Sequence, residues 1–414
     1  MSESEISKFV NLYLLLYADD TVIFAENPSE LQNRLNKVEL YCSKWKLKLN
    51  VNKSKVVIFS RGKVRKFPEF TACGEAIEVV DSFLYLGLKL NHNNKMKIAQ
   101  KDIYDRASRA MFALLKKCNT LNLPVDVILD LFNKTIVPIL SYGSEIWGFD
   151  EFELLQKLQL RFYKIVLKLR ITTPSLMVFG ETGHYPLWVE VKVKMLMYWF
   201  KLISFDNRDK LSSNVYKLLY SLYSSGKYEN AYLKCIRSCL IEVGLYHLWL
   251  SQDVSSIKLS IFKSHIKQCY KDLFLQQWYS KLDNDSIYIN YRLFKTSFKQ
   301  EYFLKSLPNN SVFALVKFRC INNPLPVNSL RFTSIPRHER ICNNCNMNEI
   351  GDEYHYLFTC PYYQEKRTDL LPKYYIKHPN VIKYSELLNS TESSLLFKLR
   401  QFICFINKSF INNK

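Results

Sequence analysis

Hydrophobic and polar positions divide the chain into a short mixed start and a longer helical remainder. Residues 9–25 form two apolar, aromatic runs around an Ala-Asp-Asp turn at 18–20, a pattern that predicts two strands joined by a tight turn. A helix is expected next, because Asn27 is a good N-cap residue and Pro28 suits the first helical position. Its apolar positions recur at steps of four and three: Leu31, Leu35, Val38, Cys42 and Trp45. Short strand signals follow at residues 55–60, 75–81 and 83–90.

From about Ile98 onward the spacing of apolar residues becomes helical. The predicted helices cover residues 98–118, 125–140, 151–170 and 393–406. Residues 186–325 have similar spacing with few sharp motifs, and we expect them to be helical as well. The fold class is therefore expected to be α+β, with the strands confined to residues 1–90.

The composition indicates a folded and strongly basic protein. Apolar residues make up 48% of the 414 residues, enough for a sizeable core, and the net charge is +20. A basic excess of this size indicates a polyanionic partner, of which nucleic acid is the commonest. Glu3 and Glu5 occupy the region where a signal peptide needs basic residues, and no apolar run approaches the roughly 18 residues of a membrane span. Together with eleven cysteines, these features predict an intracellular, reducing compartment, nucleus or cytoplasm, with no secretion and no membrane partner.

Two adjacent carboxylates, Asp19 and Asp20, lie at the tip of the first expected hairpin. Mg²⁺ prefers carboxylate oxygens together with substrate phosphates, so such a pair suits phosphoryl transfer through two metals. The alternative, on these residues alone, is that the aspartates only end a strand as turn formers.

Basic residues concentrate in two segments. Residues 44–66 contain nine bases and no acid and alternate with apolar residues, which predicts a strand-like element with one basic face. In the helix expected at 151–170, the bases fall on one side: Lys157, Arg161, Lys164 and Lys168. The other side is apolar, and no acid occurs from Gln156 to Arg170. Both faces suit a phosphate backbone, and the alternative for each is a solvated charged surface.

A third candidate site is a cluster of metal-ligand residues near the C-terminus, spaced C-x2-C-x9-H-x4-C: Cys342, Cys345, His355 and Cys360. Three thiolates and one imidazole form a closed tetrahedral set, which predicts a structural zinc. Asp352 and Glu353 are possible competing ligands, although soft thiolates favour zinc over carboxylates. The alternative is chance clustering of buried thiols.

A second set has wider spacing, with members four residues apart on expected helices: Cys235, Cys239, His265 and Cys269. A metal bridging the two pairs is one interpretation. Their apolar neighbours favour buried helix thiols instead.

Three motifs occur in order within about 70 residues: Tyr17-Ala18-Asp19-Asp20; Asn50, Lys53 and Ser54; and Phe83, Tyr85, Leu86 and Gly87. This arrangement resembles the second half of a reverse transcriptase palm, most closely that of non-LTR (LINE-like) retrotransposons. The resemblance implies that Asp19 binds a catalytic magnesium, with Asp20 as a less essential neighbour. It places Lys53 near the incoming nucleotide. It also implies that Tyr17 and the Phe83–Gly87 hairpin contact the substrate and primer end.

The same resemblance implies how the chain is organised and which partners it has. The implied domains are a partial palm (1–90), a helical thumb (91–185), a helical connector (186–325), a zinc module (326–366) and a tail (367–414). The thumb, with the basic helix at 151–170, implies RNA and RNA–DNA duplex as partners.

A polymerase palm needs a third carboxylate from an earlier strand, and the residues before Tyr17 contain no aspartate. We therefore expect an N-terminally truncated RNA-directed DNA polymerase that is inactive alone. One alternative is a non-catalytic, zinc-containing nucleic-acid-binding protein derived from such an element. Another is a structural protein with incidental basicity.

Overall fold

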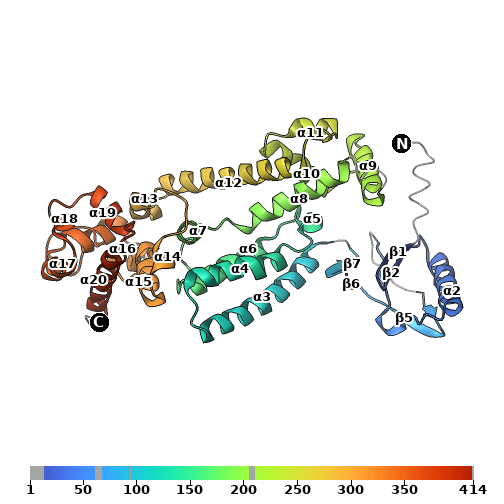
Figure 1. The fold of residues 1–414 in the computed structure, drawn as a ribbon, viewed down its shortest axis with the longest axis horizontal. Helices are drawn as coiled ribbons and strands as arrows, with labels where there is room; N and C mark the ends of the chain where they lie inside the picture. Colours follow the sequence, from blue (N-terminus) through green and yellow to red (C-terminus); the bar gives the residue numbers. More distant parts are fainter. Residues whose placement is uncertain (1–13, 61–67, 94, 205–209, 413–414) are drawn as a thin grey trace. The chain divides into compact units, whose positions relative to one another are not determined.

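The computed structural model describes residues 14–60, 68–93, 95–204 and 210–412. Within these ranges the strands end at Asn91, and the later elements are helices (Figure 1). The predicted α+β class, with strands only in the N-terminal part, is therefore confirmed. None of the described helices is both long and apolar enough to cross a membrane.

The chain forms two compact units, each assembled from segments that are separate in the sequence. The first unit comprises Met1–Ile103, Gly143–Phe152 and Lys194–Phe262. The second comprises Tyr104–Tyr142, Glu153–Val193 and Lys263–Lys414. The five domains expected from the sequence stay a prediction.

The first unit contains the predicted N-terminal hairpin. β1 (Leu14–Tyr17) pairs antiparallel with β2 (Asp20–Ile23), and Tyr17 lies opposite Asp20. Ala18 and Asp19 form the loop, and Ala18 has a φ of 53°, in the left-handed region that two-residue hairpin loops require. Strand, turn and strand are thus confirmed for 14–23, while the start of the expected first strand lies outside the described residues.

The helix α2 (Pro28–Lys44) begins at its predicted cap. The side-chain oxygen of Asn27 accepts a hydrogen bond from the Glu30 N–H at 2.9 Å, and the Glu30 carboxylate accepts one from the Glu26 N–H at 2.9 Å. These bonds satisfy backbone donors around the start of the helix. The expectation that Trp45 belongs to the apolar face is wrong. This residue is 60% exposed, because the helix ends at Lys44.

A small sheet and α2 share one core. β3 (Lys55–Val56) pairs in parallel with β5 (Glu75–Val79), which pairs antiparallel with β4 (Phe70–Ala72). The buried core residues come from α2, β4, β5 and one turn: Leu35, Val51, Phe70, Ala72 and Ile77. Val56 of β3 is partly buried and packs against them. Burial of this apolar surface holds the segment together.

The continuous basic strand expected over residues 44–66 does not form where the structure describes it. Lys46 has a φ of 55°, and Val51–Lys53 is a 3-10 turn, so only Lys55 and Val56 are paired as a strand. The reason is that Val51 turns inward to the core, which interrupts the alternation. Residues 61–66, with four of the nine bases, lie outside the described residues.

The segment expected as a strand at 83–90 is a second hairpin. β6 (Ser82–Tyr85) pairs antiparallel with β7 (Leu88–Asn91) around the loop Leu86-Gly87. Both loop residues have positive φ, 46° and 77°, as in a type I′ turn.

Helices complete the first unit. They are α5 (Ser144–Trp147), α9 (Leu211–Ser224), α10 (Ala231–Glu242), α11 (Tyr246–Ser251) and the C-terminal part of α8 (Leu187–Ile203). Buried polar groups link them, because the Trp199 indole donates to the Tyr216 hydroxyl at 2.8 Å and this hydroxyl donates to Gln252 at 2.7 Å. The prediction that residues 186–325 are helical is confirmed for the described part of that range.

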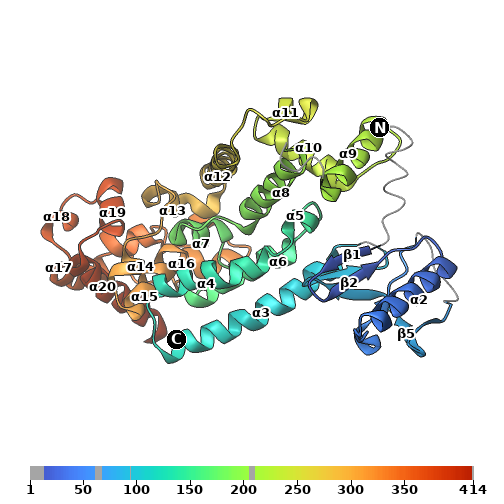
Figure 2. The ribbon, with the colours of Figure 1, turned by 45° about the vertical axis from the view of Figure 1, so that its right-hand side comes forward.

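The second unit is helical throughout its regular elements. Its longer helices include α4 (Val125–Leu140), α6 (Glu153–Val166), α7 (Ser175–Thr182), α15 (Asn309–Arg319), α19 (Val381–Leu388) and α20 (Ser393–Asn412), with parts of α3 (Lys97–Thr120) and α12 (Leu259–Asn284). Shorter helices are α13 (Ile289–Phe294), α14 (Phe303–Ser306), α16 (Pro326–Ser329), α17 (Gln364–Leu370) and α18 (Lys373–Ile376). α4 and α6 lie side by side (Figures 1 and 2). Phe132 of α4 stacks on Phe162 of α6 with ring centroids 4.0 Å apart.

Most predicted helix bounds agree with the structure, but α6 is shorter than the expected 151–170. Lys168 adopts a φ of 52°, and the Leu169 N–H donates to the Lys164 carbonyl at 2.8 Å. This left-handed closing turn ends the helix before Lys168. At the other end of the chain, α20 continues to Asn412, beyond the expected 406.

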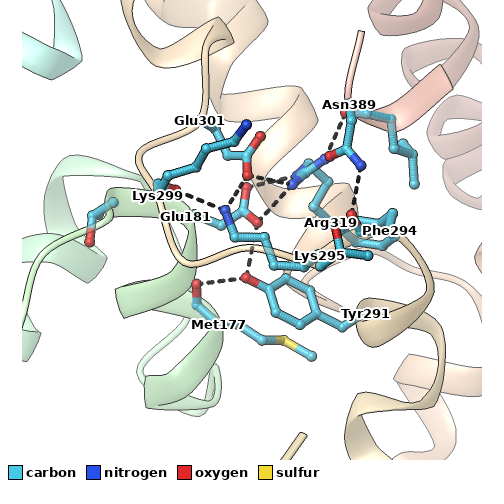
Figure 3. A network of polar contacts seen from close by, with 12 residues as sticks. Met177, Glu181, Tyr291, Phe294, Lys295, Lys299, Glu301, Arg319 and Asn389 are labelled. Carbon is cyan, nitrogen blue, oxygen red and sulfur yellow. Dashed lines mark hydrogen bonds and ion pairs between the residues drawn. The ribbon is translucent and has the colours of Figure 1, made fainter. Parts of the chain in front are cut away.

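The core of the second unit contains a network of charged side chains, drawn in Figure 3. Arg319 donates to both carboxylate oxygens of Glu181, at 2.7 and 3.1 Å, and lies 3.1 Å from Glu301. Lys295 pairs with Glu301, and the Tyr291 hydroxyl donates to Glu181 at 3.1 Å. All five side chains are buried. The two cations and two carboxylates are therefore matched within the core.

Candidate functional site

The aspartate pair lies at the exposed tip of the first hairpin. Asp19 is a loop residue, Asp20 begins β2, and both are exposed. Tyr17 precedes them and is 62% exposed. Their carboxylates can therefore meet a hydrated metal, but they provide oxygens from only one hairpin. No third metal-ligating side chain joins them among the residues that the structure describes.

The second motif builds a turn rather than a cluster of functional groups. The Asn50 side chain accepts a hydrogen bond from the Lys53 N–H at 3.2 Å, and the Ser54 hydroxyl donates to the Asn50 carbonyl at 3.0 Å. Val51, inside this turn, is buried in the core. Asn50 and Ser54 thus shape the backbone, and Lys53 remains an exposed side chain at its end.

The third motif is the β6–β7 hairpin. Phe83 and Tyr85 are half-buried and lie opposite Leu90 and Leu88 in the ladder. Gly87 supplies the second left-handed residue of the loop, a conformation that glycine adopts without strain. Leu86 is partly exposed at the tip, so an apolar side chain faces solvent at the end of the hairpin.

The four basic residues predicted on one face of α6 have different environments. The ammonium of Lys157 pairs with Glu153 at 2.9 Å, and the guanidinium of Arg161 lies 5.4 Å from the Phe112 ring. Lys168, beyond the helix end, lies 4.3 Å from the Phe313 ring. Lys164 donates to the Ile171 carbonyl at 2.6 Å, and burial lowers its pKa. Three of the four are exposed, while Lys164 is half-buried and occupied by the backbone.

The predicted metal ligands do come together. The ligand atoms of Cys342, Cys345, His355 and Cys360 all lie within 4.8 Å of one another. The sulfurs of Cys342 and Cys360 are 3.9 Å apart, and Cys345 Sγ is 3.4 Å from His355 Nε2. Two thiolates bound tetrahedrally to one zinc at 2.3 Å have sulfurs about 3.8 Å apart. The donor set and its spacing therefore fit a zinc ion.

Local structure brings these ligands together. Ile341 and Ile350 form an antiparallel bridge, and the Cys342 N–H donates to the Glu349 carbonyl at 2.9 Å. His355 begins a π-helical turn, His355–Thr359, and Cys360 ends it. Gly351 allows the bridge to approach the neighbouring helix, since a Cβ there would lie 2.8 Å from a Pro326 side-chain carbon.

The surroundings of the cluster favour deprotonation of one of its thiols, that of Cys342. Hydrogen bonding with the Cys360 thiol, and with His355 and Tyr356, lowers the pKa of Cys342 to about 3, whereas pairing with Cys342 raises the pKa of Cys360. Burial lowers the pKa of His355, but its contacts with Cys342 and Glu349 outweigh this effect and raise it overall. These surroundings therefore favour the thiolate form of Cys342, which is the form that binds a metal.

Residues that the sequence did not indicate support the ligands. His355 Nδ1 lies 2.7 Å from a Glu349 carboxylate oxygen, which also accepts a bond from the Thr359 hydroxyl at 3.1 Å. The Tyr356 hydroxyl lies 3.2 Å from Cys342 Sγ. An acid six residues before the histidine was the only available signal for Glu349, and such a spacing is too common to identify a role.

Asp352 and Glu353, the possible competing ligands, have other partners. Asp352 accepts from the His355 N–H at 3.0 Å and pairs with Arg337 at 3.2 Å. Glu353 is buried and accepts from the amides of Asn290, at 2.7 Å, and Asn323, at 3.2 Å. Because they do not join the described ligand cluster, they do not act as competing ligands in this structure.

The wider-spaced thiols form two separate pairs. Cys235 and Cys239 have sulfurs 4.0 Å apart on α10, and Cys269 Sγ is 3.5 Å from His265 Nε2 on α12. Neither pair belongs to a group of three or more metal ligands within the described parts of the chain. The expectation of helix positions is confirmed, but the expectation of burial holds only for Cys239, because Cys235 and Cys269 are half-buried and His265 is exposed.

Comparisons with known proteins place the N-terminal motifs in a family. Residues 2–90 match the family described as reverse transcriptase (RNA-dependent DNA polymerase). A transposon-derived protein of Caenorhabditis elegans is 32% identical over 148 residues, which represent 34% of this chain and 50% of that protein. The present chain thus spans about half the length of this relative. The family match includes both hairpins and the turn between them, so residues 2–90 are similar to part of a reverse transcriptase, and 34% of the chain is similar to a transposon-derived protein.

Proposed function

We propose that the chain is part of the RNA-directed DNA polymerase of a non-LTR, LINE-like retrotransposon, with a structural zinc near its C-terminus. The observation that carries the proposal is the presence, in one chain, of the family match at 2–90 and the assembled Cys342–Cys360 ligand cluster. The net charge of +20 supports RNA and RNA–DNA duplex as partners.

The zinc role proposed here is structural rather than catalytic. Three thiolates and the imidazole of His355 complete a tetrahedral set, which leaves no position for water or substrate. The ligands are also mostly buried: Cys342 is 4% exposed, Cys360 is 0% and His355 is 2%. Binding would stabilise the short irregular segment around residues 341–360, because the ligands come from elements with few backbone bonds between them.

The proposed polymerase chemistry assigns a role to each N-terminal motif. The 3′-hydroxyl of a primer attacks the α-phosphate of a deoxynucleotide, and the bond to pyrophosphate breaks. Magnesium, when bound, neutralises charge on the reacting phosphate. Asp19 supplies the carboxylate for it, with Asp20 beside it, and Lys53 lies near the triphosphate. Tyr17 and the Phe83–Gly87 hairpin hold the substrate and primer end.

We further propose that these 414 residues do not polymerise by themselves. A two-metal site needs carboxylates on both sides of the reacting phosphate. Asp19 and Asp20 come from one hairpin, and no acidic side chain from the rest of the described chain completes a ligand group with them. Because the metal site is incomplete, the incoming nucleotide is also not held in the position that the reaction needs.

The experiment that tests catalysis is primer extension on an RNA template with Mg²⁺ and deoxynucleotides. We expect no extension by the 414-residue chain. We also expect extension when a palm segment with a further catalytic aspartate is joined to its N-terminus, and loss of that activity in Asp19→Asn. The matched control is Asp81→Asn, an exposed aspartate outside the hairpin tip. Extension by the chain alone would contradict the inactivity proposal, and activity insensitive to Asp19→Asn would contradict the assignment of Asp19.

A second candidate is a non-catalytic nucleic-acid-binding protein derived from such an element. The exposed basic residues Lys157, Arg161 and Lys168 favour it, because binding to a phosphate backbone needs no completed metal site. Salt-dependent RNA binding without extension, even in the joined chain, would select this candidate.

A further inference from the structure

A pocket of about 370 Å³ in the second unit, lined by both polar and apolar groups, lies outside the two hairpins and the Cys342–Cys360 cluster. It is bordered by the loop between α13 and α14 and by the turn after α19. Lysine, hydroxyl and amide groups line it, including Lys299, Lys305, Thr296, Ser297, Asn389 and Thr391. The volume lies in the range of small-molecule sites.

The loop that forms the pocket is held in place from several directions. Lys295 Nζ donates to the Lys299 carbonyl at 2.8 Å, and the Asn389 amide donates to the Phe294 carbonyl at 2.6 Å (Figure 3). The backbone also passes very close to Gly183, where an added Cβ would lie 2.3 Å from the Gln300 nitrogen. Because the loop is fixed before any ligand arrives, little ordering entropy is lost on binding.

The charged residues that line the pocket are three lysines, Lys295, Lys299 and Lys305, and one carboxylate, Glu301. Burial raises the pKa of Glu301, but its pairing with Lys295 and Arg319 outweighs this effect and lowers it overall. Lys299 adds a further attraction to Glu301, and Lys305 is in no ion pair within the part of the chain that the structure describes. The lining therefore carries a positive excess next to hydroxyl and amide groups. Such a combination suits an oxyanion.

We propose that this pocket binds a phosphate group, with Lys299 and Lys305 as charged ligands and Thr296, Ser297 and Thr391 as hydroxyl donors. The phosphate comes either from a nucleic-acid backbone or from a free nucleotide or pyrophosphate. The proposal does not depend on polymerase activity or zinc binding, since the pocket shares no residue with either site.

The test compares the full chain with Lys299→Ala/Lys305→Ala and with the control Lys281→Ala/Lys373→Ala. The control removes the same charge from exposed positions outside the pocket. Two probes are titrated, inorganic pyrophosphate and a short single-stranded oligodeoxynucleotide, and thermal unfolding checks that each variant is folded. We expect the pocket variant to bind at least one probe about tenfold more weakly, whereas the control changes little.

The two probes separate the sources of the phosphate. Weaker binding of pyrophosphate alone assigns the pocket to free phosphates. Weaker binding of the oligodeoxynucleotide, with pyrophosphate as a competitor, assigns it to the nucleic-acid backbone. Equal affinities of the pocket and control variants for both probes would overturn the proposal.

Discussion

The carboxylate of Glu349 lies 2.7 Å from Nδ1 of His355, and the other ring nitrogen, Nε2, lies 3.4 Å from Cys345 Sγ. An acceptor at Nδ1 favours the tautomer with hydrogen on that nitrogen, which leaves the lone pair of Nε2 toward the sulfurs. Glu349 therefore orients the imidazole with Nε2 toward the sulfurs, as the proposed zinc site requires, and lies outside the ligand set itself.

Replacement of Glu349 by Ala should weaken zinc binding by about 10- to 100-fold, because the ring loses the partner that fixes its orientation. Competition with a chromogenic chelator measures the affinity. Glu365→Ala, an exposed acid outside the cluster, is the control and should bind zinc as the unmodified chain does. An unchanged affinity in Glu349→Ala would mean that packing alone orients His355.

Zinc content itself provides the second prediction. The chain purified under reducing conditions should carry about one Zn²⁺, and Cys342→Ser should release it and loosen the segment around residues 341–360. Cys404→Ser removes a half-buried thiol outside the cluster and should retain the metal. Metal analysis and hydrogen exchange report the two effects. A metal-free intact chain would show that the four side chains pack together without an ion.

Zinc affinity should decrease on acidification. The pKa of His355 is raised above its ordinary 6.5 in the metal-free fold. Protonation of His355 therefore stabilises the metal-free fold fully below pH 6.5, and this stabilisation is lost as the pH rises through the raised pKa. Metal binding needs the neutral ring, so proton competition begins above pH 6.5 and strengthens as pH falls. Chelator competition across this range is the measurement. A constant affinity down to about pH 5 would be inconsistent with His355 as a ligand.

The buried ion pair between Glu181 and Arg319 predicts a large stability effect. Glu181→Gln should lower the free energy of unfolding by about 3–5 kcal/mol, because the buried network is left with two cations, Arg319 and Lys295, and one carboxylate, Glu301. Lys157→Ala breaks the exposed pair with Glu153 and should cost no more than about 1 kcal/mol. Denaturant unfolding of the full chain compares them. Similar values for both variants would show that the core around Arg319 admits water.

The four basic residues predicted on one face of α6 should contribute unequally to the salt dependence of duplex binding. Replacing Lys157, Arg161 and Lys168 together by Ala should reduce the slope of log affinity against log salt by about two to three for duplex binding. Lys164→Ala should leave the slope unchanged, because its ammonium donates to the Ile171 carbonyl, and should instead lower stability by about 1 kcal/mol. A slope equal to that of a triple control at Lys281, Lys373 and Lys377 would exclude this face from binding.

Local sequence signals were sufficient for several elements. Asn27 and Pro28 marked the start of α2, and the spacing of apolar residues gave the bounds 125–140 of α4, because capping and amphipathic periodicity act within a few residues. The ligand spacing identified the Cys342–Cys360 cluster, since four soft donors within a short segment have few other uses.

Long-range contacts decided the rest. β4 has no strong local signal in the sequence and forms because its backbone pairs with β5. The expected basic strand is interrupted at Val51, because this side chain packs into the core. A short strand is stabilised only by partners that the sequence does not reveal.

The buried charges were equally hidden from the sequence. Glu181 and Arg319 are 138 positions apart in the chain, and each looks like an ordinary surface residue of an amphipathic segment. Only tertiary packing brings their charges to 2.7 Å and removes water from around them. The sequence by itself therefore determined the ligand set, the aspartate hairpin and most helices, because these depend on neighbours along the chain. The folded structure decided which charges are buried, which lysines are occupied by other groups of the chain and which acid lies against His355, because these depend on neighbours in space.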